Sequence, residues 1–204
     1  MVTGRPRLLI ATTNPGKFNE LSSLLLDCPF AMVSLKDLGI DGNVAETGST
    51  FEENASLKAA AYGRASGLPT LADDSGLEVD ALGGEPGVFS SRFAGPRSTD
   101  ADRIALLLQK LDNIPEGERD ARFRCVIAVS WPGESPGLYS GECLGRIVQT
   151  PRGANGFGYD PIFFLPELDR TMAELSADEK SWISHRGKAA RKAAAALKRR
   201  VAGD

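Results

Sequence analysis

A glycine-containing turn near the start of the chain has the residue types of an anion-binding loop. Backbone N–H groups at a helix start, together with the helix dipole, favour an anion. A lysine that ends the turn adds a positive charge. A tight turn with a solvated lysine explains the segment equally well. The segment is also not a Walker loop, because it lacks the first glycine and the final Ser/Thr of that motif. The candidate phosphate-binding residues are Thr12, Thr13, Asn14, Pro15, Gly16 and Lys17.

Two adjacent carboxylates, Asp73 and Asp74, follow the apolar segment 70–72. Successive side chains of a strand point to opposite faces, so at most one faces a site directly unless a turn reorients the other. A carboxylate there could hold Mg²⁺ or activate a water molecule. The alternative is an Asp-rich turn shaped by Ser75 and Gly76. We favour the functional interpretation, because an aspartate pair directly after an apolar strand is unusual for a plain turn.

A third cluster precedes and enters an expected helix. Glu46 is a second candidate metal carboxylate, and Asn54 and Lys58 are four residues apart, so they share one helix face. Taken alone, each of these residues is better explained as part of a solvated face.

The segment Gly156–Pro161 interleaves two aromatic residues, Phe157 and Tyr159, with glycines. Such a loop lets a ring approach a flat ligand closely, although rings that anchor a loop to the core explain it equally well. His185 is the only histidine, and a lone histidine is more often structural than catalytic. The chain has no Gly-x-Ser-x-Gly motif, which argues against a Ser/His/Asp hydrolase of the nucleophile-elbow type.

Strands and helices must alternate to position these residues. Apolar runs predict strands, and apolar residues at helical spacing behind Ser/Thr caps predict helices. The alternation is irregular, so we expect an α/β fold with a mixed sheet rather than a doubly wound one. Strands are expected at 8–11, 70–72, 77–79, 126–129, 138–148 and 162–164, and helices at 18–25, 51–66, 99–111 and from 187 onward, with Ala190, Ala194, Leu197 and Val201 facing inward.

Composition narrows the protein class. With 204 residues, 42% hydrophobic and 25% charged, the chain suits one globular domain or two closely joined lobes. A net charge of −3 gives no overall basic footprint for bulk nucleic acid. Three cysteines without a CxxC pair indicate a reducing cytosol rather than a disulfide framework. No apolar run is long enough for a signal core or a membrane span.

Together the motifs resemble the inosine triphosphate pyrophosphatase family, in the family's order from about Leu8 to about Lys198. Arg103 departs from the Asn that bacterial members commonly carry, without affecting a site assignment. The matching pieces are Thr12-x-Asn14-x-x-Lys17, Glu46-Thr47-Gly48, Phe51-x-x-Asn54-Ala55-x-x-Lys58, Ala72-Asp73-Asp74-Ser75-Gly76-Leu77, Gly84-x-Pro86-Gly87, Ser90-x-Arg92-Phe93, Gly156-Phe157-Gly158-Tyr159-Asp160-Pro161-Ile162-Phe163, Glu179-Lys180 and Ser184-His185-Arg186-Gly187.

The resemblance implies a single domain over residues 1–204, an elongated mixed sheet with flanking helices forming two lobes around a central nucleotide-binding cleft. It implies a cytoplasmic homodimer with a small-molecule substrate and neither nucleic-acid nor membrane partners. The implied reaction is Mg²⁺-dependent hydrolysis of ITP, dITP and XTP to the monophosphate and pyrophosphate, which cleanses the nucleotide pool. A nucleotide kinase and a non-catalytic nucleotide-binding module are the rival interpretations.

The resemblance also assigns roles. The loop Thr12–Lys17 and Lys58 would hold the triphosphate, and Ser75 would also contact substrate. Glu46 and Asp74 would place Mg²⁺, with Asp73 as an alternative ligand, and Asp74 would be the catalytic base that orients the attacking water. Donors aimed at a 6-oxo group would reject adenine by roughly 10⁴-fold. The base-binding set comprises Phe157, Gly158, Tyr159 and Asp160, with Lys180, His185 and Arg186 on the purine edge.

Overall fold

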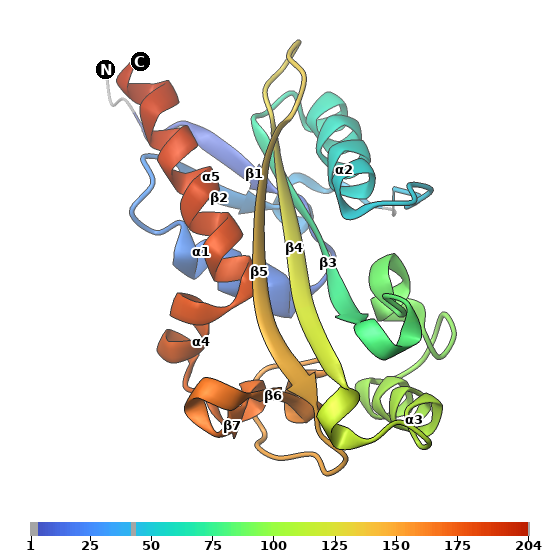
Figure 1. Cartoon of the computed structure of the whole chain (residues 1–204). Helices are drawn as coiled ribbons and strands as arrows, with labels where there is room; N and C mark the ends of the chain where they lie inside the picture. Colours follow the sequence, from blue (N-terminus) through green and yellow to red (C-terminus); the bar gives the residue numbers. More distant parts are fainter. Residues whose placement is uncertain (1–3, 42–43, 204) are drawn as a thin grey trace. The chain divides into compact units, whose positions relative to one another are not determined.

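The computed structural model describes residues 4–41 and 44–203, which form a mixed α/β structure (Figure 1). Seven strands lie in the order β2-β1-β3-β4-β5-β6-β7. β1 pairs in parallel with β2 and β3, whereas β5-β6-β7 pair antiparallel, so the predicted mixed sheet is confirmed. The elements are β1 Arg7–Ile10, α1 Pro15–Leu24, β2 Ala31–Ser34, α2 Phe51–Ser66, β3 Thr70–Val79, α3 Asp100–Lys110, β4 Asp120–Ser130, β5 Gly137–Ile147, β6 Phe163–Leu165, β7 Arg170–Thr171, α4 Ala177–Ile183 and α5 His185–Ala202.

The chain divides into two compact units. The first unit comprises the described residues of 1–74, 125–141 and 186–204, and the second unit comprises 75–124 and 142–185. None of the helices in the described part of the chain is long and apolar enough to cross a membrane.

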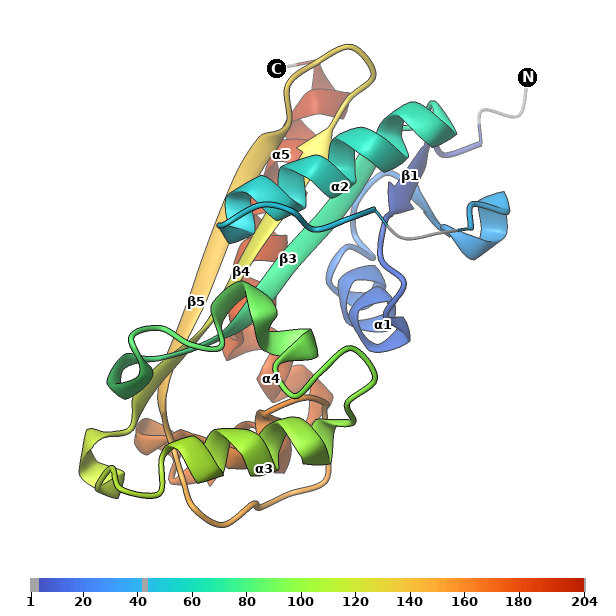
Figure 2. The same cartoon turned by 90° about the vertical axis from the view of Figure 1, so that its right-hand side faces the viewer.

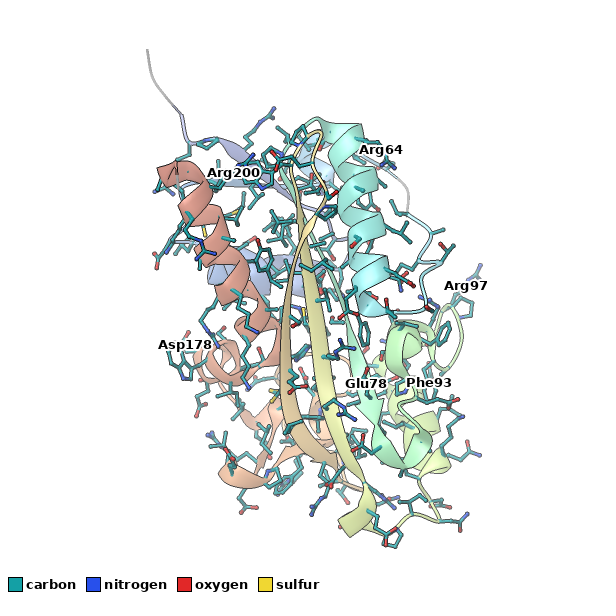
Figure 3. All side chains as sticks on the ribbon, turned by 45° about the horizontal axis from the view of Figure 1, so that its top comes forward. Arg64, Glu78, Phe93, Arg97, Asp178 and Arg200 are labelled. Carbon is teal, nitrogen blue, oxygen red and sulfur yellow. The ribbon has the colours of Figure 1, made fainter. Side chains whose placement is uncertain are left out.

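In the first unit, helices cover both faces of the strands. Leu8 and Ile10 of β1 pack in one core with Leu21 of α1 and Ala189 and Ala193 of α5. α2 lies on the opposite side of β3 and β4 from α5 (Figures 1 and 2). Arg64 and Arg200, labelled in Figure 3, mark these two helices. The apolar face of α2 is buried and consists of Phe51, Ala55, Ala59 and Tyr62.

The second unit has its own apolar core. Leu77 and Val79 of β3 pack with Leu107 of α3, Phe123 of β4 and Ile162, which precedes β6. α3 begins at the predicted cap: Thr99 accepts the N–H of Asp102, and the Asp102 carboxylate accepts the N–H of Thr99 in return. This reciprocal pair satisfies donors that the first helical turn leaves open.

The cap of α2 is not a full capping box. Thr50 accepts the N–H of Glu53, but the Glu53 carboxylate accepts the N–H of Ser49 at 2.6 Å instead of that of Thr50. The helix ends where expected, at Gly67, whose φ of +67° lies in the left-handed region that glycine adopts without strain.

Two features differ from the sequence interpretation, and three elements were not predicted. The segment Asp73–Gly76 is not the Asp-rich turn of the alternative interpretation, because β3 continues unbroken to Val79. Val201 does not face inward: its side chain is 48% exposed, one turn beyond the last core residue of α5, Leu197. The strands β2 and β7 and the helix α4 were not predicted.

Candidate active site

The predicted loop at residues 12–17 joins β1 to α1 and keeps its shape through its own side chains. Asn14 is the N-cap, and its Oδ1 accepts the N–H of Lys17 at 3.1 Å. Thr12 Oγ1 accepts the N–H of Asn14 at 3.2 Å. Pro15 occupies the first turn, where a missing N–H does no harm. Thr13, Asn14 and Pro15 are exposed, so the positive end of α1 is accessible to an anion.

Lys17 does not extend into solvent. Its Nζ lies 3.0 Å from Oδ2 of Asp73, whose side chain is 1% exposed. Arg186 approaches the same oxygen with Nε at 3.5 Å, and its other end donates to Glu20 Oε2 at 2.5 Å. Burial alone would raise the pKa of Asp73, but Lys17, Arg186 and Lys58 together hold that pKa well below its usual range. Asp73 is therefore an ionised anchor between two cations.

Asp74 uses the other face of β3. Its Oδ1 lies 3.1 Å from Lys58 Nζ, and the same ammonium lies 2.7 Å from Glu46 Oε1. The two aspartates contact different cations, which agrees with the predicted alternation of side chains along the strand. The interpretation of Lys58 as part of a solvated helix face is wrong, since only 12% of its side chain is exposed.

The surroundings of Asp74 disfavour the charged form of its carboxylate. Burial raises its pKa, Lys58 and Lys17 oppose that rise, and Glu46 adds to it, so the pKa stays above its usual value. Burial would lower the pKa of Lys58, but Asp74, Asp73 and Glu46 outweigh it and raise that pKa, so the ammonium remains charged. Asp74 Oδ2 is buried and has no hydrogen-bond partner among the described residues.

Gly48 brings Glu46 to this site. The Gly48 N–H donates to Oδ1 of the buried Asn54 at 2.8 Å. A Cβ at position 48 would lie 2.6 Å from Glu53 Cβ, so only glycine lets this segment approach α2 so closely. Asn54 therefore holds the segment that places Glu46 over Lys58.

This donor set fits Mg²⁺ bound together with a substrate. Mg²⁺ is usually held by one or two carboxylates plus phosphate oxygens and waters, rather than by an all-protein cage. Glu46 and Asp74 converge on one cation position, and Asp74 Oδ2 is left over as a ligand oxygen. Within residues 4–41 and 44–203 no group of three or more His, Cys, Asp or Glu side chains could hold a metal alone. Asp73 is engaged instead by Lys17 and Arg186.

A second cluster of predicted residues lies in the second unit, around the loop 156–160. Asp160 Oδ2 accepts the N–H of Phe157 at 3.0 Å and lies 2.7 Å from Lys180 Nζ. That ammonium is 4.8 Å from the centroid of the Phe157 ring. A Cβ at Gly156 would collide with the Asp160 carboxylate, and its φ of +78° also requires glycine. Phe157, Lys180 and Asp160 thus form one compact group.

The remaining predicted residues of the second unit are mainly structural in their contacts. The buried Tyr159 donates its hydroxyl to the Ser90 carbonyl at 3.0 Å, and burial raises its pKa. His185 is 4% exposed and stacks on Phe123, with ring centroids 4.8 Å apart. Gly158 has a φ of +65°, and Ser75 is half-buried in β3.

The predicted residues fall into two sets. The first unit holds Thr12, Thr13, Asn14, Pro15, Gly16, Lys17, Glu46, Lys58, Asp73, Asp74 and Arg186, and the second holds Ser75, Phe157, Gly158, Tyr159, Asp160, Lys180 and His185. Sequence reasoning missed Glu20, which pairs with Arg186 alongside Asp73. Its position three residues after Lys17 places it on the same face of α1, a signal that could have found it.

The mixed sheet and the carboxylate–lysine site define an α/β protein with side chains suited to a phosphate–metal complex. The comparisons with known proteins specify that class further. The sequence profile of the Ham1 family matches residues 8–196, and the chain belongs to this family.

Relatives and solved structures agree with this assignment. The chain is 52% identical over 182 residues to a dITP/XTP pyrophosphatase of Geobacillus kaustophilus, covering 89% of each chain. It is 49% identical to a dITP/XTP pyrophosphatase of Geobacter sulfurreducens, covering 90% of this chain and 92% of that one. The structure of the Staphylococcus aureus Ham1 protein matches with a TM-score of 0.84 at 45% identity, covering 94% of this chain and 97% of that one.

Proposed function

We propose that this protein hydrolyses the non-canonical purine nucleoside triphosphates ITP, dITP and XTP to the monophosphate and pyrophosphate, with Mg²⁺ as cofactor. The observation that carries the proposal is the pair Glu46 and Asp74 around Lys58, with one Asp74 oxygen left without a partner. The names of two relatives support the substrate class, because these relatives are 52% and 49% identical to this chain over 89% and 90% of its length.

The triphosphate is bound by cations of the first unit. Lys58 offers a protonated ammonium, and Lys17 follows the exposed start of α1, whose N–H groups favour an anion. A lysine ammonium has three donors, so Lys58 can keep a carboxylate partner while it contacts a phosphate oxygen.

Glu46 and Asp74 would hold the metal ion. Mg²⁺ at this position would supply Lewis-acid chemistry and neutralise charge on the phosphate oxygens. Asp73 has a different task, because its charge fixes Lys17 and Arg186 in place on the other face of β3.

Asp74 is the base that orients the attacking water. Its raised pKa makes it a better proton acceptor than an ordinary aspartate, and a base works best when its pKa approaches the working pH. The water oxygen forms a bond to the α-phosphorus, and the bond from that phosphorus to the bridging oxygen breaks. One water proton passes to the carboxylate, the other stays with the monophosphate, and pyrophosphate leaves with the bridging oxygen.

The base is recognised by residues of the second unit together with Arg186 of the first. Phe157 stacks on the purine, and Tyr159 and Asp160 shape the loop around it. Asp160 fixes Lys180, and an ammonium only donates hydrogen bonds, which suits a 6-oxo group. His185 and Arg186 complete the purine-edge donors in this proposal. Adenine presents an amino donor at the same position, which leaves such donors unsatisfied.

We further propose that the protein acts as a homodimer in the cytoplasm, without nucleic-acid or membrane partners. Light scattering after size-exclusion chromatography tests the oligomeric state, because a single species of one-chain mass contradicts a dimer.

A nucleotide panel tests the proposed reaction. ITP, dITP, XTP, GTP and ATP are each incubated with enzyme and Mg²⁺, and released pyrophosphate is measured after its conversion to phosphate by added pyrophosphatase. Fast release from ITP and XTP and slow release from ATP is expected. A phosphotransferase would need a second substrate, and a non-catalytic binding module would release no pyrophosphate at all.

A further inference from the structure

Asp100 at the start of α3 contacts the loop that carries Phe157, and it is paired with Arg103 of the same helix. Figure 2 shows this loop, in orange, passing alongside α3. The Asp100 carboxylate bridges two partners: Oδ2 accepts the N–H of Gly158 at 2.6 Å, and Oδ1 pairs with the Arg103 guanidinium. Neither residue belongs to the site described above.

Arg103 is fixed at several points. Its Nη1 donates to the carbonyl of Ser91 at 2.9 Å and to the carbonyl of Ser98 at 2.7 Å. Ser98 follows the loop on which Arg97 is labelled in Figure 3, directly before α3. Only 16% of the Arg103 side chain is exposed. A planar guanidinium held by two carbonyls and a carboxylate has little freedom to turn, so it orients Asp100.

These hydrogen bonds are part of a network that fixes the loop 156–160. Tyr159 donates to the carbonyl of Ser90, which neighbours the carbonyl that Arg103 binds. The loop is therefore fixed to the same 3-10 turn, Gly87–Arg92, by two routes: directly through Tyr159, and through Asp100 and Arg103 from Gly158. Phe157 directly precedes the two fixed residues, so its ring position depends on both.

We propose that Asp100, oriented by Arg103, is a positioning residue for purine recognition: it holds the Gly158 backbone so that Phe157 is preorganised to stack on the base. The inference rests on the proposed function. A displacement of about 1 Å in a positioning group can cost roughly 100-fold in activity, so the loop geometry bears on substrate affinity.

Two variants in the same helical turn form a matched pair. Asp100→Ala removes the contact to Gly158, whereas Asp102→Ala removes a carboxylate whose hydrogen-bond partner is Thr99 of the helix cap. We expect Asp100→Ala to raise KM for ITP roughly 10–100-fold, because the variant loses one charge-assisted hydrogen bond. Its kcat should stay within about threefold of the wild-type value. Asp102→Ala should lower Tm and leave KM within about twofold.

The Arg103→Ala variant tests the coupling. If Arg103 acts through Asp100, the double variant is no worse in KM than Asp100→Ala alone. Multiplied effects in the double variant, an unchanged KM in Asp100→Ala, or an equal rise in Asp102→Ala would overturn the proposal.

Hydrogen exchange separates this inference from the proposed function. In the protein without nucleotide, amide exchange across residues 156–160 should accelerate roughly 10–100-fold in Asp100→Ala and stay unchanged in Asp102→Ala. If Asp100→Ala does not fold, Arg103→Ala provides the same comparison with the helix cap intact. A wild-type enzyme inactive on ITP refutes the proposed function alone, whereas unchanged exchange refutes the positioning role.

Discussion

Asparagine at position 74 should abolish catalysis without weakening the fold. The Asp74→Asn side chain keeps its volume but cannot accept a proton at neutral pH, and loss of a general base costs roughly 10²–10⁴-fold. The folded-state pKa of Asp74 is raised, so its stabilising contribution is complete below the unfolded pKa and is lost as pH rises through the folded one. At pH 7 the Tm of Asp74→Asn should therefore be no lower than that of the wild type. The Tm is measured in EDTA, so that no bound metal offsets the charge of Asp74.

The neighbouring position provides the control with the opposite sign. The pKa of Asp73 is depressed, so its ionised form stabilises the fold above the unfolded pKa. Asp73→Asn leaves Lys17 and Arg186 without this shared carboxylate, and breaking a buried ion pair costs about 3–5 kcal/mol. For a chain of this size that corresponds to a fall in Tm of roughly 6–20 °C.

Pyrophosphate release and differential scanning fluorimetry on both variants test this reasoning. Near-normal turnover in Asp74→Asn would remove Asp74 as the base. A larger loss of Tm in Asp74→Asn than in Asp73→Asn would reverse the assignment of the two carboxylates.

Three further predictions concern the metal, the base and pH. EDTA should abolish activity, and Mg²⁺ or Mn²⁺ but not Zn²⁺ should restore it, since Glu46 and Asp74 offer only oxygen ligands; full activity in EDTA would contradict the metal role. Arg186→Ala should lower kcat/KM for ITP roughly 10–100-fold more than for ATP, because an arginine only donates hydrogen bonds and so suits a 6-oxo group rather than an amino group. Equal losses for the two nucleotides would assign Arg186 to its ion pairs with Glu20 and Asp73. Glu179 pairs with Arg170 and caps α4, and these contacts lower the pKa of Glu179 to about 2. Its stabilising contribution is therefore present above the unfolded pKa of about 4.3 and is lost as pH falls toward 2. The Tm curves of wild type and Glu179→Gln should converge over that range, and parallel curves would contradict the prediction.

Local signals made much of the fold predictable. Thr50 and Thr99 cap helices that the sequence located, because the cap, the apolar spacing and the terminal glycine are all near neighbours in the chain. The same kind of signal, Ser176 followed by Glu179, marks the start of α4 and was overlooked. β2, with its four residues Ala31–Ser34, has no alternating pattern and exists through its pairing with β1.

The site was predictable as a set of residue types but not as a set of pairs. Alternation along β3 separated Asp73 from Asp74, but only the folded chain shows which cation each one meets. Lys58 illustrates the difference: its spacing from Asn54 was visible, whereas its burial depends on the close approach of Gly48 to α2. Asp100 and Gly158 are far apart in sequence, and no local pattern connects them.

The division of the chain into discontinuous units has a consequence for biosynthesis. The first unit draws on three separate stretches, and the last of them is α5, whose alanines at 189 and 193 fill the core beside Leu8 near the other end of the chain. A nascent chain emerging from the ribosome exposes that apolar surface until α5 has left the exit tunnel. The core of the first unit therefore closes only after α5 has emerged, through contacts of high sequence separation that form slowly. Truncation by even the last two turns of α5 would remove Leu197 and leave that surface exposed.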